Sequence, residues 1–409
     1  MKSLLLFICR IIPALVFIFS GFVKAIDPVG GAVKFEDYFT AFGMEGLSPL
    51  ALPLSMALAS LEFVIGFFLL CKLYMRFSSS IVLIITAFFT VLTFFLAIFN
   101  PVSDCGCFGD AIKLTNWETF GKNIVLLLFT IVLFKYRGSY RNNYHFINNL
   151  TAAALSILFI IGFNIHNYRH LPVIDFRPYK IGTNIPDNMR VPEGAEMPEF
   201  ETVFVLEKEG AQHTFSVDDY PYDDTSWVFV ESRTKIVKEG FVPPLQAFSL
   251  YSPEHDDEVH SEVLNRPGPT FLLIAPLLEK MPHKVILPLA ELSETARQKD
   301  LPFYVVTSSG TEEIKAFDNE HATMFNYLQS DKTTLKTIIR SNPGLLLLQD
   351  GTIAGKWHYN DMPEASIMNN PLANALEQQR HKRNNLVRWL SIAGLLLIPS
   401  LIFRSKTTK

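Results

Sequence analysis

Asp104-Cys105-Gly106-Cys107-Phe108-Gly109-Asp110 is a two-cysteine turn that follows one apolar run and precedes another. Its glycines give a backbone flexible enough to close a small disulfide ring or to present two thiolates together. A Cys-x-Cys ring is tighter than a Cys-x-x-Cys ring, and strained disulfides are easier to reduce. The turn therefore predicts that Cys105 and Cys107 are redox-active, catalytic cysteines.

Two other interpretations of the turn stay open. The cysteines could form a static disulfide at a loop tip, or they could bind a metal ion. A metal site would need further Cys or His residues nearby, and this loop contains none, so no metal is expected. Only four cysteines occur in 409 residues, which excludes a disulfide-stapled scaffold.

The composition indicates a membrane protein. Hydrophobic residues make up 49% of the chain and the mean hydropathy is +0.23, which is too apolar for an ordinary soluble protein. Lipid is therefore an expected partner. The net charge is −4 and no basic stripe follows a helix face, so no nucleic acid is expected to bind.

Five apolar runs are long enough to cross the hydrocarbon core of a bilayer as helices, which takes about 20 residues. They cover residues 4–23, 50–71, 78–100, 117–134 and 146–163. The first has no small-x-small cleavage site, so we interpret it as a retained helix and not as a signal peptide. A sixth run, 389–403, is only about 15 residues long and contains Pro399. The sequence thus predicts a membrane α-helical bundle of five or six transmembrane helices.

Basic residues in the short loops predict the orientation, because Lys and Arg concentrate on the cytoplasmic side. Alternate loops carry them: Lys2, Lys72, Arg76, Lys135, Arg137 and Arg141. The cysteine turn and the long segment 168–385 then lie on the opposite side, where disulfides persist. We therefore expect a multi-pass protein of the bacterial inner membrane whose large domain is periplasmic.

Two ionisable residues, Arg10 and Glu62, lie inside apolar runs, where such groups usually face a bundle interior or a cavity. Glu62 falls near the middle of its run, and Arg10 lies about 9 Å from the cytoplasmic end of its own. If the two helices pack together, Arg10 could reach Glu62. The pair would then either fix helix packing or line a proton route or a quinone site.

The connection between the first two runs, residues 24–49, is rich in glycine and aromatic residues. It predicts an amphipathic or re-entrant segment in the outer interface, beside the cysteine turn. Cys9 and Cys71 fall near the cytoplasmic helix ends, about a membrane thickness from the turn. We expect both to be small packing residues.

Three motifs resemble those of the DoxX/MauE family of membrane proteins. They are Arg10 with Phe19-Ser20-Gly21-Phe22-Val23-Lys24, Leu61-Glu62 with Gly66, and Cys105-Gly106-Cys107-Phe108-Gly109-Asp110. The resemblance covers residues 1–136 and implies a four-helix core. It also implies a link to thiol–disulfide metabolism and, in the DoxX and DoxD branches, to quinone-linked sulfur oxidation. A quinone is the one cofactor that the resemblance suggests, and no other is evident.

The composition changes near residue 168, where acidic residues, prolines and short strand-like stretches begin. Five prolines within 168–198 favour an extended surface linker. Stretches 200–207 and 212–217 predict a hairpin, and 226–232 predicts a third strand. The chain is thus divided into a membrane domain at 1–136, a fifth transmembrane helix at 137–167, a linker and small β unit at 168–237, an α/β domain at 238–362, and a connector with a C-terminal transmembrane helix at 363–409.

Residues 238–362 alternate strand and helix patterns, which predicts an α/β domain with a covered sheet. The domain resembles the thioredoxin-like domains of membrane-anchored thiol reductants. Matching features are Pro243-Pro244 with Phe248 at an opening hairpin, Asn342-Pro343-Gly344 at a loop that usually carries a cis peptide, and the turn Asp350-Gly351. Where that family has Cys-x-x-Cys, this chain reads Ala275-Pro276-Leu277-Leu278-Glu279-Lys280.

Without a thiolate, this domain cannot exchange disulfides itself. It can still bind, and Pro276 and Pro343 would frame a groove that docks an extended partner polypeptide. The alternative is a structural remnant or an assembly surface. His283, His321 and His358 lack metal-ligand spacing and are expected to be ordinary surface or packing residues.

Two functions follow from these features. The first is a thiol–disulfide or quinone-linked redox component, in which Cys105 and Cys107 exchange with a periplasmic protein or small thiol. The second is a non-catalytic membrane assembly or maturation factor, whose outer domain recruits a partner. Only the first requires the cysteine pair to change oxidation state.

Overall fold

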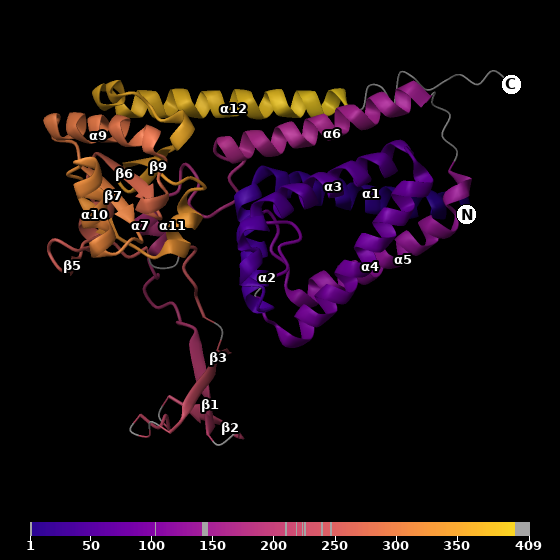
Figure 1. The fold of residues 1–409 in the computed structure, drawn as a ribbon, viewed down its shortest axis with the longest axis horizontal. Coiled ribbons are helices and arrows are strands. Elements are labelled where there is room, and N and C mark those ends of the chain that lie inside the picture. The colour runs from indigo at the N-terminus through magenta and orange to yellow at the C-terminus, as the bar shows by residue number, and fades with distance from the viewer. Residues whose placement is uncertain are drawn as a thin grey trace.

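The computed structural model describes residues 2–102, 104–140, 146–208, 211–217, 219–222, 224, 226–238, 240–245 and 248–396. Within them, a helical bundle and an α/β domain lie side by side, and a small sheet extends from the α/β domain (Figure 1).

The bundle contains five helices that are long and apolar enough to cross a membrane, which confirms the five predicted runs. They are α1 (Lys2–Ile26), α3 (Ala51–Cys71), α4 (Met75–Phe99), α5 (Asn116–Lys135) and α6 (Phe146–Arg169), with the 3-10 turn η2 (Arg137–Ser139) before α6. A Cβ atom on Gly21 would lie 2.4 Å from Phe63 N, and one on Gly66 would lie 2.6 Å from Ile18 N. Because neither glycine has a side chain, the backbones of α1 and α3 can approach closely.

Residues 24–49 form a cover over the end of the bundle that faces the α/β domain, as Figure 1 shows for α2. This segment contains α2 (Pro28–Ala41) and the 3-10 helix η1 (Glu45–Leu50). Asp27 caps α2 by accepting a hydrogen bond from Gly30 N, and Phe39 packs against Ala51 of α3. The segment is therefore largely helical, and its predicted position in the membrane interface stays a prediction.

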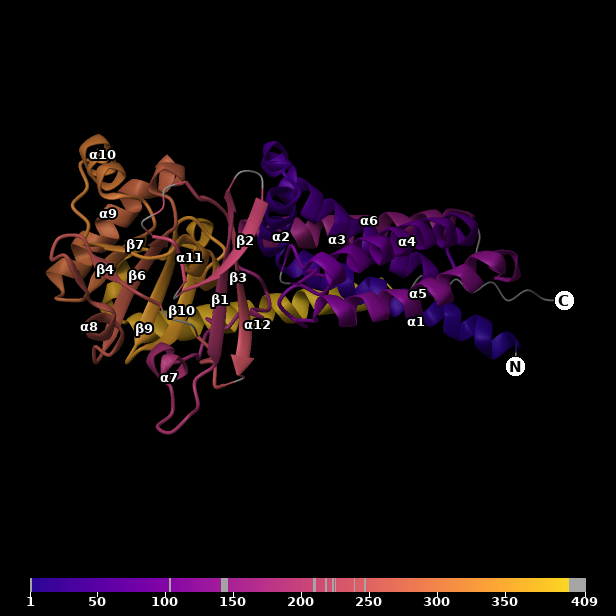
Figure 2. The same ribbon diagram turned by 90° about the horizontal axis from the view of Figure 1, so that it is seen from below.

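The small sheet comprises β1 (Glu199–Lys208), β2 (Ala211–Ser216) and β3 (Val228–Lys238) in the order β2-β1-β3. Both pairings are antiparallel, and β1 and β2 form the predicted hairpin. The third strand runs further than the predicted 226–232. Figure 1 shows this sheet projecting away from the α/β domain and the bundle, and Figure 2 looks along that projection from below.

The α/β domain is built on a seven-stranded sheet with the order β10-β9-β6-β7-β8-β4-β5. Strands β6, β7 and β8 are parallel, whereas β9 pairs antiparallel with both β6 and β10. Apolar clusters cover both sheet faces, which explains the unbroken apolar runs of β6 and β9. The strands are β4 (Tyr251–Ser252), β5 (Asp257–Glu258), β6 (Pro269–Ala275), β7 (Phe303–Thr307), β8 (Tyr327–Gln329), β9 (Gly344–Gln349) and β10 (Thr352–His358).

Helices cover this sheet on both sides. They are α7 (Ile185–Met189), α8 (His260–Leu264), α9 (His283–Gln298), α10 (Thr311–His321), α11 (Lys332–Ile338) and α12 (Pro371–Leu395), with the 3-10 turns η3 (Leu278–Lys280), η4 (Tyr359–Asp361) and η5 (Ala365–Asn369). The predicted 168–198 linker is wrong in part: Leu171, Tyr179 and Ile185 are buried in the domain core. Prolines limited helix formation there without preventing burial.

Helix α12 leaves the α/β domain and runs beside α6 (Figure 1). The Trp389 ring packs on Phe159 and Phe163, with centroids 5.9 and 5.2 Å apart. The predicted sixth run, 389–403, therefore begins within a longer helix that starts at Pro371. Residues 397–403 of that run lie outside the described residues.

Candidate functional site

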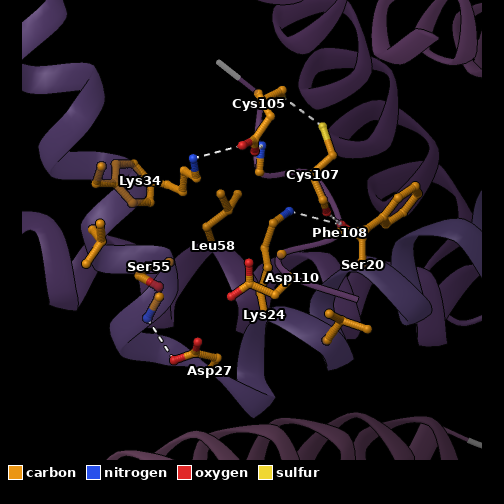
Figure 3. Close-up of a pocket in the computed structure, with 18 of the residues that line it drawn as sticks. Ser20, Lys24, Asp27, Lys34, Ser55, Leu58, Cys105, Cys107, Phe108 and Asp110 are labelled. Atoms are coloured by element: carbon orange, nitrogen blue, oxygen red, sulfur yellow. Dashed lines mark hydrogen bonds and ion pairs between the residues drawn. The ribbon is translucent and has the colours of Figure 1, made fainter. Parts of the chain in front are cut away.

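The cysteine turn places two sulfur atoms face to face (Figure 3). Cys105 Sγ and Cys107 Sγ are 2.9 Å apart, and both residues are free thiols. Gly106 has φ +67° and Gly109 has φ +52°, a region that side-chain-bearing residues rarely adopt. Cys105 is buried and Cys107 is half-buried.

A buried ion pair lies beneath the turn. Lys24 Nζ is 2.7 Å from both carboxylate oxygens of Glu62, and their side chains are only 12% and 5% exposed. The Ser20 hydroxyl lies 2.8 Å from Glu62 Oε2 and 2.7 Å from the carbonyl oxygen of Cys107, so it can donate to either acceptor. The ion pair is thereby linked to the cysteine backbone.

The predicted contact between Arg10 and Glu62 is wrong. Arg10 Nη1 donates to the carbonyl oxygens of Leu69 and Leu70 at 2.8 and 2.6 Å. These carbonyls lie about 10 Å along α3 from Glu62, at a rise of ~1.5 Å per residue. Lys24, which belongs to the α1 motif but had no assigned role, takes the position that Arg10 was expected to fill.

Helix α2 holds the turn from its other side. Tyr38 Oη donates to the carbonyl oxygen of Cys105 at 3.0 Å, and Lys34 Nζ pairs with Asp104 Oδ2 at 2.9 Å. Asp104 Oδ1 accepts a hydrogen bond from Gly106 N, which tightens the turn. These contacts were not predicted, because no local pattern indicates which residues of the 24–49 segment face the cysteines.

The two thiols differ in acidity. A hydrogen bond from Cys105 lowers the pKa of Cys107 to about 6; burial opposes this effect, and the charges of Lys122 and Lys24 support it. The same hydrogen bond, together with burial, raises the pKa of Cys105. Cys107 therefore ionises more readily than Cys105, which makes Cys107 the stronger candidate nucleophile near neutral pH.

A cavity of about 1020 Å³ adjoins the thiols. Its apolar walls come mainly from α2, α3 and α4 and include Phe39, Leu58 and Phe89. Ser20, Lys24, Glu62 and both cysteines supply its polar end, parts of which are visible in Figure 3. On the α/β side it is lined by residues of 172–178 and by α11 with Arg340.

The two proline loops of the α/β domain are joined to each other. Asn342 Nδ2 donates to the carbonyl oxygen of Leu277 at 2.8 Å, and the Asn342–Pro343 peptide is cis, as the resemblance implied. Pro276 and Pro343 do not line the thiol cavity in the described part of the chain. Any docking role of these prolines is thus separate from the cavity wall.

Two of the histidines considered above, His283 and His321, come together with Glu320 away from the thiols. His283, Glu320 and His321 offer ligand atoms within 4.8 Å of one another, so the histidines are not all scattered as expected. They lie at the surface, and His321 packs against Phe317. Cys9 and Cys71 are 1% and 6% exposed and form no disulfide, and Cys71 packs in the apolar bundle.

Comparisons with known proteins bear on two parts of the chain. Residues 200–239 match a domain of unknown function (DUF8463). No curated protein and no solved structure matches. Residues 2–136, which contain α1 to α5 and the cysteine turn, match the methylamine utilisation protein MauE family. The chain is therefore a multi-pass membrane protein with a MauE-like helical region, followed by a mixed α/β domain.

Proposed function

We propose that Cys105 and Cys107 are a redox-active pair that exchanges disulfides with an extracytoplasmic protein or a small thiol. The observation that carries this proposal is the 2.9 Å separation of the two sulfurs beside a buried lysine and an open cavity. The lowered pKa of Cys107 supports it, because exchange begins with a thiolate.

In the direction that reduces a partner, the Cys107 thiolate attacks one sulfur of the partner disulfide. A mixed disulfide forms and one partner thiolate leaves. Cys105 then gives up its proton and attacks Cys107 Sγ, which forms the Cys105–Cys107 disulfide and releases the second partner thiolate. Two electrons pass from the pair to the partner, and the reverse sequence oxidises a partner dithiol.

The α/β domain would serve as a thioredoxin-like docking module on the periplasmic face of a bacterial inner membrane. The strand order β7-β6-β9-β10, with α9 between the parallel strands and α12 after the last, supports the thioredoxin-like assignment. The domain has no cysteine, so it would bind through the loops at Pro276 and Pro343 and leave the chemistry to the turn.

A quinone suits the cavity as an electron carrier. Its apolar walls would hold a lipid-soluble ring and tail, and Ser20 and Lys24 would hold an oxygen-bearing head group next to Cys107. A quinone takes up two electrons and two protons, which matches the change between a dithiol and a disulfide. The residues of this chain would contribute the binding surface and the thiols.

The test is alkylation trapping in intact cells, using a protein in which Cys9 and Cys71 are replaced by Ser as background. We expect the pair to be partly reduced, and Cys105→Ser to trap a mixed disulfide through Cys107, because Cys105 is the resolving thiol. Cys107→Ser should trap far less. A pair that stays oxidised under all conditions, and whose removal affects only stability, would favour the assembly-factor function instead.

A further inference from the structure

The α/β domain contacts the thiol site through two basic side chains. Arg340, which follows α11, pairs with Asp27 at 2.9 Å (Nε to Oδ2) and with Asp110 at 3.5 Å (Nη2 to Oδ2). Lys336 of α11 pairs with Glu36 of α2 at 3.4 Å. The Arg340 side chain is only 9% exposed, so it is largely enclosed by the two parts of the molecule that it connects.

The two acids that Arg340 contacts belong to different pieces of the site. Asp27 caps the N-terminus of α2, and Asp110 is the last residue of the cysteine turn. A single guanidinium with several donors can bridge two carboxylates in a fixed geometry, which a lysine does less well. Gly30 leaves room for this arrangement, since a Cβ there would lie 2.8 Å from Arg340 Nη2.

Helix α11 and Arg340, which follows it, form the wall of the cavity on the side of the α/β domain. Lys336, Thr337 and Arg340 line it together with Cys105 and Cys107. Cys105 is only 8% exposed, and α2 covers the turn from the side through Tyr38 and Lys34. In this arrangement the thiols face a cavity large enough for a small molecule, and α11 contributes to the wall that a folded partner would have to displace.

We propose that Arg340 is a positioning residue of the thiol site that also controls its access. Docked, it fixes Asp110 and α2 and keeps α11 over the cavity; released, it lets α11 move off the cavity and exposes Cys107 to a protein-sized partner. This inference deepens the proposed function, because it divides the redox partners by size. A small thiol or lipid-soluble carrier uses the docked form, and a protein uses the released form.

The experiment uses the full-length, reduced protein in lipid nanodiscs, with Cys9 and Cys71 replaced by Ser. The rates of Cys107 labelling are measured with N-ethylmaleimide and with a maleimide carrying a large polyethylene glycol chain. Arg340→Gln should raise the ratio of large-reagent to small-reagent rates about fivefold, as expected from the loss of ion pairs that hold a closed state. Arg340→Lys should fall between Arg340→Gln and the wild type.

The half-buried pair Lys336–Glu36 provides the matched rescue. Lys336→Glu should raise the same ratio, and the charge swap Lys336→Glu with Glu36→Lys should restore it, whereas Lys315→Glu on α10 should change nothing. A ratio within about twofold of wild type for Arg340→Gln, or a swap that fails to restore it, would overturn the proposal. Equal acceleration of both reagents would also overturn it, because this would mean general loosening of the turn. The assay starts from reduced protein, so its outcome is independent of whether the pair turns over in cells.

Discussion

Two buried lysines, one in each half of the molecule, make the same kind of ion pair in different surroundings. Lys24 pairs with Glu62 at 2.7 Å, beside two thiols and a large cavity. Lys356 of β10 is fully buried, and its Nζ lies 2.9 Å from Asp175 Oδ2 and donates to the carbonyl oxygens of Tyr179 and Ile338. Lys24 borders a cavity where a reactant could bind, whereas Lys356 lies inside the packed α/β domain.

This difference shows that a buried, perturbed charge is not by itself a functional site. Burial, with the Arg177 charge, lowers the pKa of Lys356 to about 7, although Asp175 acts in the opposite direction. All three of its hydrogen bonds go to groups that tie residues 175–179 and Ile338 to the sheet. The charge of Lys24 instead lies near a candidate nucleophile, Cys107, and it helps to lower the pKa of that thiol. Function depends on the adjacent reactive group and open space.

The pH dependence of labelling gives the largest expected effect. A thiol with a pKa of about 6 is half ionised at pH 6, whereas an ordinary thiol near 8.5 is less than about 1% ionised. Cys107 alkylation should thus be on the order of 100-fold faster at pH 6 than that of an unperturbed thiol. The rate should fall as pH drops below 6 and level off above about 7. Rates from pH 5 to 9, resolved by peptide mass spectrometry, test this; half-maximal labelling near pH 8.5 would contradict it.

Replacing the lysine of the closed core should affect stability and spare the thiols. Lys356→Met leaves Asp175 buried with Arg177 as its remaining charged partner, and we expect a loss of about 2 kcal/mol. Hydrogen exchange of β9 and β10 in the full-length protein measures this loss. The alkylation rate of Cys107 should stay within about twofold of wild type. A large change in that rate would remove the distinction between the two lysines.

Replacing Lys24, the lysine of the bundle, should have the opposite effect: it should change the reactivity of the thiols and spare the stability of the α/β domain. Lys24→Gln removes a positive charge that lowers the pKa of Cys107, and a rise of about one pKa unit makes labelling at pH 5 about tenfold slower. The double variant Lys24→Gln with Glu62→Gln should recover part of the rate, because the Glu62 charge raises the same pKa. An unchanged rate in the single variant would show that Lys24 serves packing alone.

Much of the fold could be predicted from local pattern. The five apolar runs are about as long as a bilayer requires, so their positions follow from composition alone. The strands of the α/β domain are short apolar stretches between turn residues, and β6 and β9, whose residues are almost all buried, are the most distinct in sequence.

The partner of Glu62 could not be predicted, and the reason is geometric. Arg10 and Lys24 are 14 residues apart, about four turns, so they lie on the same face of α1. Only the offset between α1 and α3, set by the close contacts of Gly21 and Gly66, decides which of them meets Glu62. Lys24 also fell outside the predicted run because it is charged, although α1 continues to Ile26.

The contacts between the domains were likewise beyond sequence reasoning. Arg340 and Asp27 are more than 300 residues apart, and neither lies in a motif that names the other. Burial of residues 171–189 was missed for a related reason, since prolines exclude a long helix but do not prevent a segment from packing on a sheet.

The smallest expected effect comes from the hydrogen bond between α2 and the turn. Tyr38→Phe removes one donation to the Cys105 carbonyl, and a neutral hydrogen bond contributes about 1 kcal/mol or less. Lys34 still holds Asp104, and Ser20 still contacts the Cys107 carbonyl, so the turn should keep its shape. Cys107 labelling at pH 5 should change less than about threefold, with Tyr222→Phe on an exposed side chain as the matched control. A tenfold change would show that α2, through Tyr38, controls the reactivity of Cys107. The contrast between Lys24 and Lys356 would then explain only the part of the site that lies beneath the turn.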